Sequence, residues 1–191
     1  MLDAIISPEW DYRYYSFDGT SVPGEAMASM RNGSGDEYAI FFTPAGAILK
    51  GFAHEAPMSP YANKERSVWP GVLDEVPEAF VDSVAQGEFS AEETTFCVWR
   101  PYGDPVWQRG DIEFPEGEDP DGSADLLGIL DGNARTYQAW AEYYYERPIS
   151  PTMVQHIYEH RPLTQEVITA LNPDLLLEEL AADIEEIGYQ A

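Results

Sequence analysis

The alternation of apolar and polar positions predicts strands in the first part of the chain and helices in the last part. The clearest element covers residues 36–54, where two apolar runs flank a turn sequence, TPAG, at 43–46. β-Branched and aromatic residues in the runs suit a pleated, packed surface, and Gly46 can take the positive φ that a hairpin turn needs. We therefore predict a β-hairpin with Phe42 and Ile48 in its core.

The same criteria predict further strands on both sides of the hairpin. Partial alternation, or enrichment in β-branched and aromatic residues, marks the segments 9–17, 25–31, 93–100 and 106–109. A cluster of turn residues at 32–35 connects the second of these segments to the hairpin. Strands placed in this order form an antiparallel meander.

Helix signals begin in the middle of the chain and dominate its end. A short helix is predicted from Pro77 to Gln86, closed by Gly87. Asn133 can cap a longer helix that runs to residue 146, because its apolar side chains fall at positions i, i+3, i+4 and i+7. Three more helices are expected to begin at Ser150-Pro151, Thr164 and Asn172-Pro173, the last of them stopped by Gly188.

Strands followed by helices favour the α+β class over a fold of alternating strands and helices. We expect an antiparallel sheet of about five to six strands, with the C-terminal helices packed on one face. The 191 residues suit a single domain, with a strand-rich part at 1–109, an acidic loop at 111–125 and a helical part at 133–187.

Composition places the protein among globular chains, since 44% of its residues are hydrophobic and 13% are aromatic. No stretch approaches the roughly 20 apolar residues of a membrane span, and the first ten residues lack the basic and apolar regions of a signal peptide. The single Cys97 lies in a strand-like run, where a buried, inert thiol is expected. These features predict a cytoplasmic protein without membrane association.

Net charge is the strongest global signal. The chain has 35 acidic and 10 basic residues, and its formal net charge is -25. Such a field repels phosphate backbones and favours cationic partners, so we expect a basic protein partner and no direct nucleic-acid binding. Acidity can also serve solubility or adaptation to salt, and the sequence leaves these alternatives open.

The sharpest motif is His156-x-x-Glu159-His160, which resembles the metal-binding helix of the inverzincin metallopeptidases over these five residues. The resemblance implies that the two histidines bind Zn²⁺ while Glu159 polarises a bound water as the catalytic residue. A third ligand would have to come from the last helix, where the candidates are Glu178, Glu179 and Asp183.

The same histidines also have an interpretation without metal. Arg161-Pro162 ends the motif helix, so His160 would lie in its last turn, where a protonated histidine interacts favourably with the helix C-terminus. The apolar residues of the helix would bury it without any ion. On this interpretation the protein holds no cofactor.

Two further patterns resemble functional sites, one a calcium loop and the other an acid/base pair. Residues 119–125 resemble the first half of an EF-hand calcium loop, but the register places Gly117 and Gly128 at ligand positions, so a solvated acidic loop is expected. His54 and Glu55 could form an acid/base pair, although neighbouring residues on a strand point to opposite faces. No serine lies in a nucleophile-elbow motif.

Tyrosines gather at 12–15 and at 143–145, and tyrosine often anchors protein interfaces. A helix cannot bury three consecutive side chains on one stripe, so Tyr143 or Tyr145 should be partly exposed. Acidic residues crowd the loop and the last helical turn, where no lysine or arginine follows to offset them. The partner-binding candidates are therefore Tyr143, Tyr145, Glu116, Glu118, Asp119, Asp183 and Glu186.

Together these features predict a non-catalytic protein-binding module. Its charge and aromatic content resemble those of small acidic inhibitors and toxin-neutralising immunity proteins, which is an analogy of physical character. The alternative is a metal-dependent hydrolase that uses the histidine motif. Neither the partner, nor a substrate, nor the oligomeric state follows from the sequence.

Overall fold

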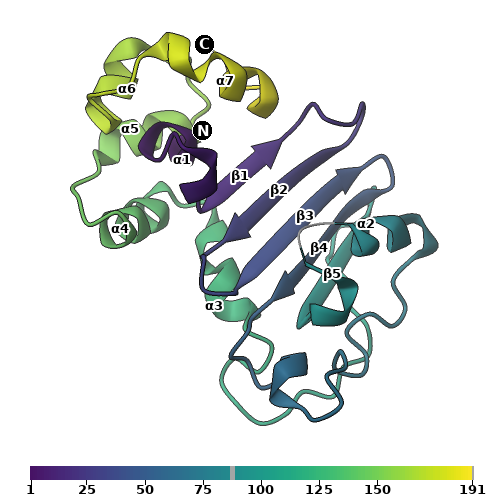
Figure 1. Ribbon diagram of the computed structural model, residues 1–191. Helices are drawn as coiled ribbons and strands as arrows, with labels where there is room; N and C mark the ends of the chain where they lie inside the picture. The colour runs from purple at the N-terminus through teal and green to yellow at the C-terminus, as the bar shows by residue number, and fades with distance from the viewer. Residues whose placement is uncertain (87–88, 191) are drawn as a thin grey trace. The chain divides into compact units, whose positions relative to one another are not determined.

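The computed structural model describes residues 1–86 and 89–190 (Figure 1). The chain forms two compact units, one made of Met1–Ser21 with Leu127–Ala191 and the other of Val22–Leu126. Within the described residues, the five antiparallel strands fall between Tyr15 and Pro101 and the longer helices follow them, so the predicted α+β class is confirmed. The packing of the C-terminal helices on one sheet face and the single-domain organisation stay predictions.

Each unit has its own set of elements. The first contains strand β1 (Tyr15–Asp18) and, with η marking a 3₁₀ helix, α1 (Leu2–Ile6), η1 (Trp10–Tyr12), η5 (Gly128–Asp131), α4 (Ala134–Tyr144), α5 (Pro151–Tyr158), α6 (Gln165–Leu171), η6 (Leu177–Leu180) and α7 (Ala181–Ile187). The second contains β2 (Ala26–Arg31), β3 (Glu37–Thr43), β4 (Gly46–Phe52), η2 (Pro60–Ala62), η3 (Glu78–Phe80), α2 (Val81–Ala85), η4 (Ala91–Glu93), β5 (Phe96–Pro101) and most of α3 (Ser123–Leu127). Within the described residues, none of the helices has both the length and the apolar character to cross a membrane.

The predicted hairpin is the pair β3–β4, whose antiparallel register runs from Thr43 opposite Gly46 to Glu37 opposite Phe52. Gly46 has the predicted positive φ, 137°. A Cβ atom at this position would lie only 2.2 Å from the carbonyl oxygen of Arg100 on β5. Both the backbone conformation and the close approach of β5 therefore require glycine.

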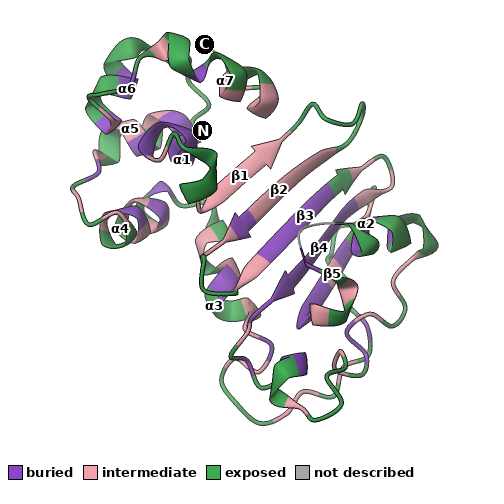
Figure 2. Ribbon diagram, viewed as in Figure 1, coloured by how far each residue is buried: buried purple, intermediate pink, exposed green. Residues whose placement is uncertain are grey.

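The core of the second unit lies on one face of strands β3, β4 and β5. Phe41, Ile48 and Trp99 form a cross-strand row on this face, and all three are buried. Figure 2 shows the buried stretches of β3, β4 and β5 in purple. Phe80 and Val84, from η3 and α2, pack into the same cluster. The predicted helix after Pro77 is thus present as η3 and α2, while Gly87 lies outside the described residues.

Phe42 is not a core residue, and that part of the hairpin prediction is wrong. Successive strand residues point to opposite faces, so Phe42 lies on the face of Ile40 and Leu49. Those two residues are buried, whereas Phe42 lies next to the end of β3, where that face is less covered. Its side chain is 41% exposed, whereas Ile48 is 1% exposed.

Alanine substitution in the hairpin should separate these two positions. We expect Ile48→Ala to lower the free energy of unfolding by about 2–5 kcal/mol, because it opens a cavity in the core. Phe42→Ala should cost about 1 kcal/mol or less, as is usual for a partly exposed site. Urea unfolding of both variants measures the difference, and equal losses would contradict the difference in burial between Phe42 and Ile48.

Two predicted strands are shorter than expected. In the segment 9–17 only β1 is extended, because Trp10–Tyr12 form a 3₁₀ turn around Arg13, whose guanidinium donates to the carbonyl oxygens of Ser7 (3.1 Å) and Pro8 (2.7 Å). The segment 106–109 is limited to one bridge between Gln108 and Trp99. Asp104 holds it in a turn, since its carboxylate accepts hydrogen bonds from the Val106 N–H (3.1 Å) and the Gln108 amide (2.6 Å).

The helix caps follow the sequence signals at most ends. Asn133 caps α4 by accepting a hydrogen bond from the Arg135 N–H (3.0 Å), and Thr164 caps α6 through the Val167 N–H (3.4 Å). Gly188 ends α7 in the left-handed conformation, with φ 71°. The predicted helix start at Asn172-Pro173 is wrong, because Asn172 closes only a turn, in which its side-chain oxygen accepts from the Asp174 N–H (3.3 Å). Its amide also donates to the Ile5 carbonyl oxygen (2.8 Å), and α7 begins at Ala181 after η6.

The core of the first unit is helical. Buried side chains of α1, α4, α5 and α6 meet in one cluster, which includes Ile5, Ala141, Val154 and Ile168. The sequence patterns did not indicate α1, whose five residues are all buried. Because all its sides are covered, α1 lacks the alternating polar face by which an amphipathic helix is recognised.

Candidate functional site

A buried carboxylate lies at the centre of the first unit. Asp3 is 4% exposed and accepts hydrogen bonds from the hydroxyls of Tyr137 and Tyr145 and from the Tyr15 N–H (2.7 Å). Burial raises the pKa of Asp3, and burial together with the nearby Asp3 raises the pKa of both tyrosine hydroxyls. The cluster joins α1, β1 and α4, so Tyr145 contributes its hydroxyl to the interior of the unit.

The other predicted tyrosine anchor is on the surface. Tyr143 is 86% exposed, and its neighbour Tyr144 is 42% exposed. Tyr144 stacks on Trp140, one helical turn earlier, with ring centroids 5.3 Å apart and an interplanar angle of 13°. The i, i+4 spacing of these two residues was the signal from which this exposed pair could have been found.

Asp183 is paired, which corrects the expectation that nothing offsets the acidic residues of the last helix. Both of its carboxylate oxygens accept hydrogen bonds from the Arg13 guanidinium, with a distance of 3.0 Å between Nη2 and Oδ2. The ion pair is largely buried, since Arg13 is 8% and Asp183 17% exposed. Glu186 is half-buried, and its partial burial together with the neighbouring carboxylates of Asp18 and Asp183 raises its pKa.

In the acidic loop some carboxylates are exposed, while that of Asp119 accepts hydrogen bonds. Glu116 and Glu118 are exposed. The Asp119 carboxylate accepts hydrogen bonds from the N–H groups of Ala124 (3.1 Å) and Asp125 (3.0 Å), in the first turn of α3. The segment that resembles a calcium loop therefore caps the N-terminus of α3 through the Asp119 carboxylate.

The histidine motif does not lie on one helix. α5 ends at Tyr158, Glu159 follows as its C-cap and His160 has a left-handed φ of 51°. His156 Nε2 lies 2.8 Å from the Pro162 carbonyl oxygen, at hydrogen-bond distance. Across residues 1–86 and 89–190, no group of three His, Cys, Asp or Glu side chains is placed to hold a metal ion.

His54 and Glu55 meet, although strand geometry predicts that they diverge. β4 ends at Phe52, and in the following turn His54 Nδ1 lies 2.7 Å from Glu55 Oε1. The His54 ring also lies beside Tyr61, with centroids 5.3 Å apart. The Glu55 side chain is 94% exposed, so the pair is a surface contact rather than an enclosed acid/base site.

Lys50 is the residue that the sequence patterns missed. It lies in the middle of β4 and is 1% exposed. Its ammonium donates to the carbonyl oxygens of Val84 (2.8 Å) and Phe89 (3.0 Å) and lies 4.5 Å from the centre of the Phe89 ring. Burial lowers the pKa of Lys50. A lysine inside an otherwise apolar strand was the available signal.

Cys97 lies opposite Lys50 on the neighbouring strand β5. The predicted burial of this thiol is confirmed, with 1% of the residue exposed. Burial raises the pKa of Cys97 to about 12, so it stays protonated at neutral pH. The pair Lys50 and Cys97 is therefore part of the core rather than a nucleophilic site.

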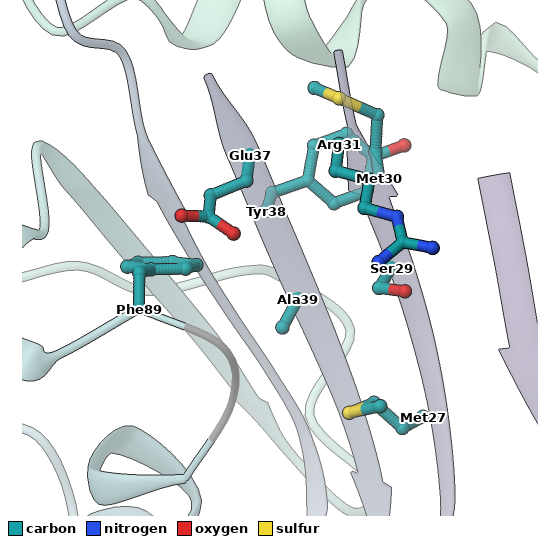
Figure 3. A pocket seen from close by; sticks show the side chains of 8 residues that line it. All are labelled: Met27, Ser29, Met30, Arg31, Glu37, Tyr38, Ala39 and Phe89. Atoms are coloured by element: carbon teal, nitrogen blue, oxygen red, sulfur yellow. The ribbon is translucent and has the colours of Figure 1, made fainter. Parts of the chain in front are cut away.

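A small hollow lies over β2 and β3, where Figure 3 shows the Glu37 carboxylate on the side of the Phe89 ring. Its volume is about 20 Å³, which is room for one water-sized group. The hollow is therefore too small for a substrate. Its lining residues are Met27, Ser29, Met30, Arg31, Glu37, Tyr38, Ala39 and Phe89.

None of these arrangements supplies the nucleophile, base and binding cavity of an enclosed active site. The described residues present many carboxylates to solvent, together with strongly exposed tyrosines such as Tyr102 and Tyr143. Comparison with protein-family models, with curated proteins and with solved structures finds no match for the chain.

Proposed function

We propose that this is a cytoplasmic, non-catalytic module that binds a basic protein through its acidic surface, and that it does not bind nucleic acid directly. The observation that supports this most is the position of the basic side chains. Arg13 and Lys50 are buried, so neither side chain can contact a partner at the surface. The net charge of -25 sets a negative field outside the protein, and fewer basic groups than the composition suggests are available to bind a polyanion.

Other basic residues are held against aromatic rings. The guanidinium of Arg66 lies 5.4 Å from the centre of the Tyr61 ring, and that of Arg109 lies 4.7 Å from the centre of the Phe114 ring. Carboxylates such as Glu116, Glu118 and Glu185 are exposed. A surface of this kind attracts cationic partners over a long range and repels polyanions, which favours protein binding over nucleic-acid binding.

The test is the rate at which the protein binds a synthetic lysine- and arginine-rich peptide. We expect the association rate to fall steeply as salt rises from about 0.05 to 0.5 M, because screening shortens the reach of exposed charges. The triple variant Glu116→Gln, Glu118→Gln, Glu185→Gln should lower the on-rate far more than it raises the off-rate. Stopped-flow fluorescence measures both rates.

An acidic peptide of the same length is the control and should not bind. Asp119 and Asp183 are left unchanged in the variant because they cap α3 and pair with Arg13, so their loss would disturb the fold. An on-rate that depends neither on salt nor on the three glutamates would contradict the proposal and would leave solubility as the role of the acidity.

A further inference from the structure

The exposed end of α4 carries a set of aromatic rings that we call the aromatic shelf: Trp140, Tyr143 and Tyr144. Tyr143 and Tyr144 are 86% and 42% exposed, and Trp140 is half-buried beneath the stacked Tyr144 ring. Single exposed aromatics are common, but the stacked rings of Trp140 and Tyr144 form a continuous surface, to which Tyr143, the preceding residue of α4, adds a separate and more exposed ring. A group that binds to this surface must have chemistry that matches exposed aromatic rings.

The stacked rings of Trp140 and Tyr144 are held in place by neighbouring aromatic side chains, and Tyr14 packs against both, at 4.7 and 4.8 Å between centroids. Tyr15 packs against Trp140 at 4.8 Å between centroids, and Tyr145 packs edge-on against Tyr144 at 5.0 Å. The Tyr145 hydroxyl in turn donates to the buried Asp3 carboxylate, 3.3 Å away. A surface whose side chains are already fixed loses little conformational entropy on binding, which is the property of an effective anchor.

The charge around the shelf restricts what it can bind. The unit that carries it has four Lys or Arg residues against 15 Asp or Glu residues. Arg13 is neutralised by Asp183, whereas Arg147 keeps its charge and donates to the Ile6 carbonyl oxygen (3.2 Å). Glu146, two residues beyond Tyr144, is exposed. Aromatic faces in a negative field attract cations, because the ring quadrupole and the surrounding carboxylates act in the same direction.

We propose that the aromatic shelf binds arginine side chains of a basic protein partner. This inference rests on the proposed function and adds the surface and the preferred side chain. A guanidinium is planar and weakly hydrated, so it stacks on tyrosine and tryptophan, whereas the ammonium of lysine stays more strongly hydrated. The shelf therefore distinguishes arginine-rich from lysine-rich segments of equal charge.

The probes are two synthetic peptides of equal length and charge, one alternating arginine and glycine, the other lysine and glycine. At about 0.1 M salt we expect the full chain to bind the arginine peptide several-fold more tightly than the lysine peptide. The double variant Tyr143→Leu, Tyr144→Leu should lose about 5- to 30-fold in affinity for the arginine peptide, from two exposed cation–π contacts. Isothermal titration calorimetry measures each affinity.

Two variants serve as matched controls. Tyr102→Leu removes a tyrosine of equal exposure, 88%, in the other unit and should leave both affinities unchanged. Tyr143→Phe, Tyr144→Phe keeps the rings and should bind the arginine peptide nearly as well as the parent. Circular dichroism reports whether each variant is folded; should the leucine pair unfold, Tyr143→Ser, at the more exposed position, provides the comparison.

The outcomes separate this inference from the proposed function. If both peptides bind with equal affinity, or if Tyr102→Leu weakens the arginine peptide as much as the shelf variant does, the shelf is not the arginine site, although the acidic surface still binds cations. If neither peptide binds the unmodified protein even at low salt, the proposed function itself is wrong.

Discussion

Replacing Arg13 by methionine should destabilise the first unit by about 3–5 kcal/mol. The Arg13 guanidinium satisfies both oxygens of Asp183 and the carbonyl oxygens of Ser7 and Pro8. Methionine keeps most of the volume but leaves the Asp183 carboxylate, only 17% exposed, without its counter-charge. An uncompensated buried charge is costly, because the desolvation is no longer offset by attraction.

A double variant separates the ion pair from the packing. Arg13→Met, Asp183→Leu removes both charges and should recover most of the loss, as buried ion pairs replaced by apolar side chains usually do. Urea unfolding followed by far-ultraviolet circular dichroism measures the three free energies. A loss below about 1 kcal/mol for Arg13→Met alone would mean that water reaches Asp183 and screens it as at a surface site.

Lys50→Ala is expected to have an effect of similar size, about 3–5 kcal/mol, because it combines a core cavity with two carbonyl groups left without a donor. Lys50→Met restores the volume and isolates the hydrogen bonds. It should cost about 1–3 kcal/mol, since the carbonyl oxygens of Val84 and Phe89 stay buried and unsatisfied. If Lys50→Met is instead as stable as the parent, the cost of burying the amine equals what its hydrogen bonds contribute.

Lys50 also gives the stability a defined pH dependence. Its folded-state pKa is lowered below the model-peptide value of 10.5, so between these two values the unfolded chain binds a proton that the folded chain does not. Stability must therefore rise with pH through that window. Lys50→Met abolishes this contribution, so the free-energy difference between parent and variant should shift in favour of the parent as the pH rises toward 10.5. Comparing the two proteins cancels the titration of the tyrosines they share.

Local signals in the sequence determined the parts of the fold whose causes lie within a few residues. The β3–β4 hairpin follows from its apolar runs and from the conformation that only Gly46 adopts readily. The caps at Asn133 and Thr164 are predictable because a side-chain oxygen reaches N–H groups two or three residues on. The exposure of Tyr143 follows from helix geometry, which leaves one of three consecutive tyrosines outside the buried stripe.

Tertiary structure alone decided which charged residues are available for binding. Asp183 appeared as an unopposed surface acid because its partner, Arg13, lies 170 residues earlier in the chain, and Tyr137 reaches Asp3 across 134 residues. Periodicity describes which face a residue takes within its own element, but not which distant element covers that face. Lys50 illustrates the same limit: only the approach of the Val84 and Phe89 carbonyl groups makes a buried ammonium stable in the middle of an apolar strand.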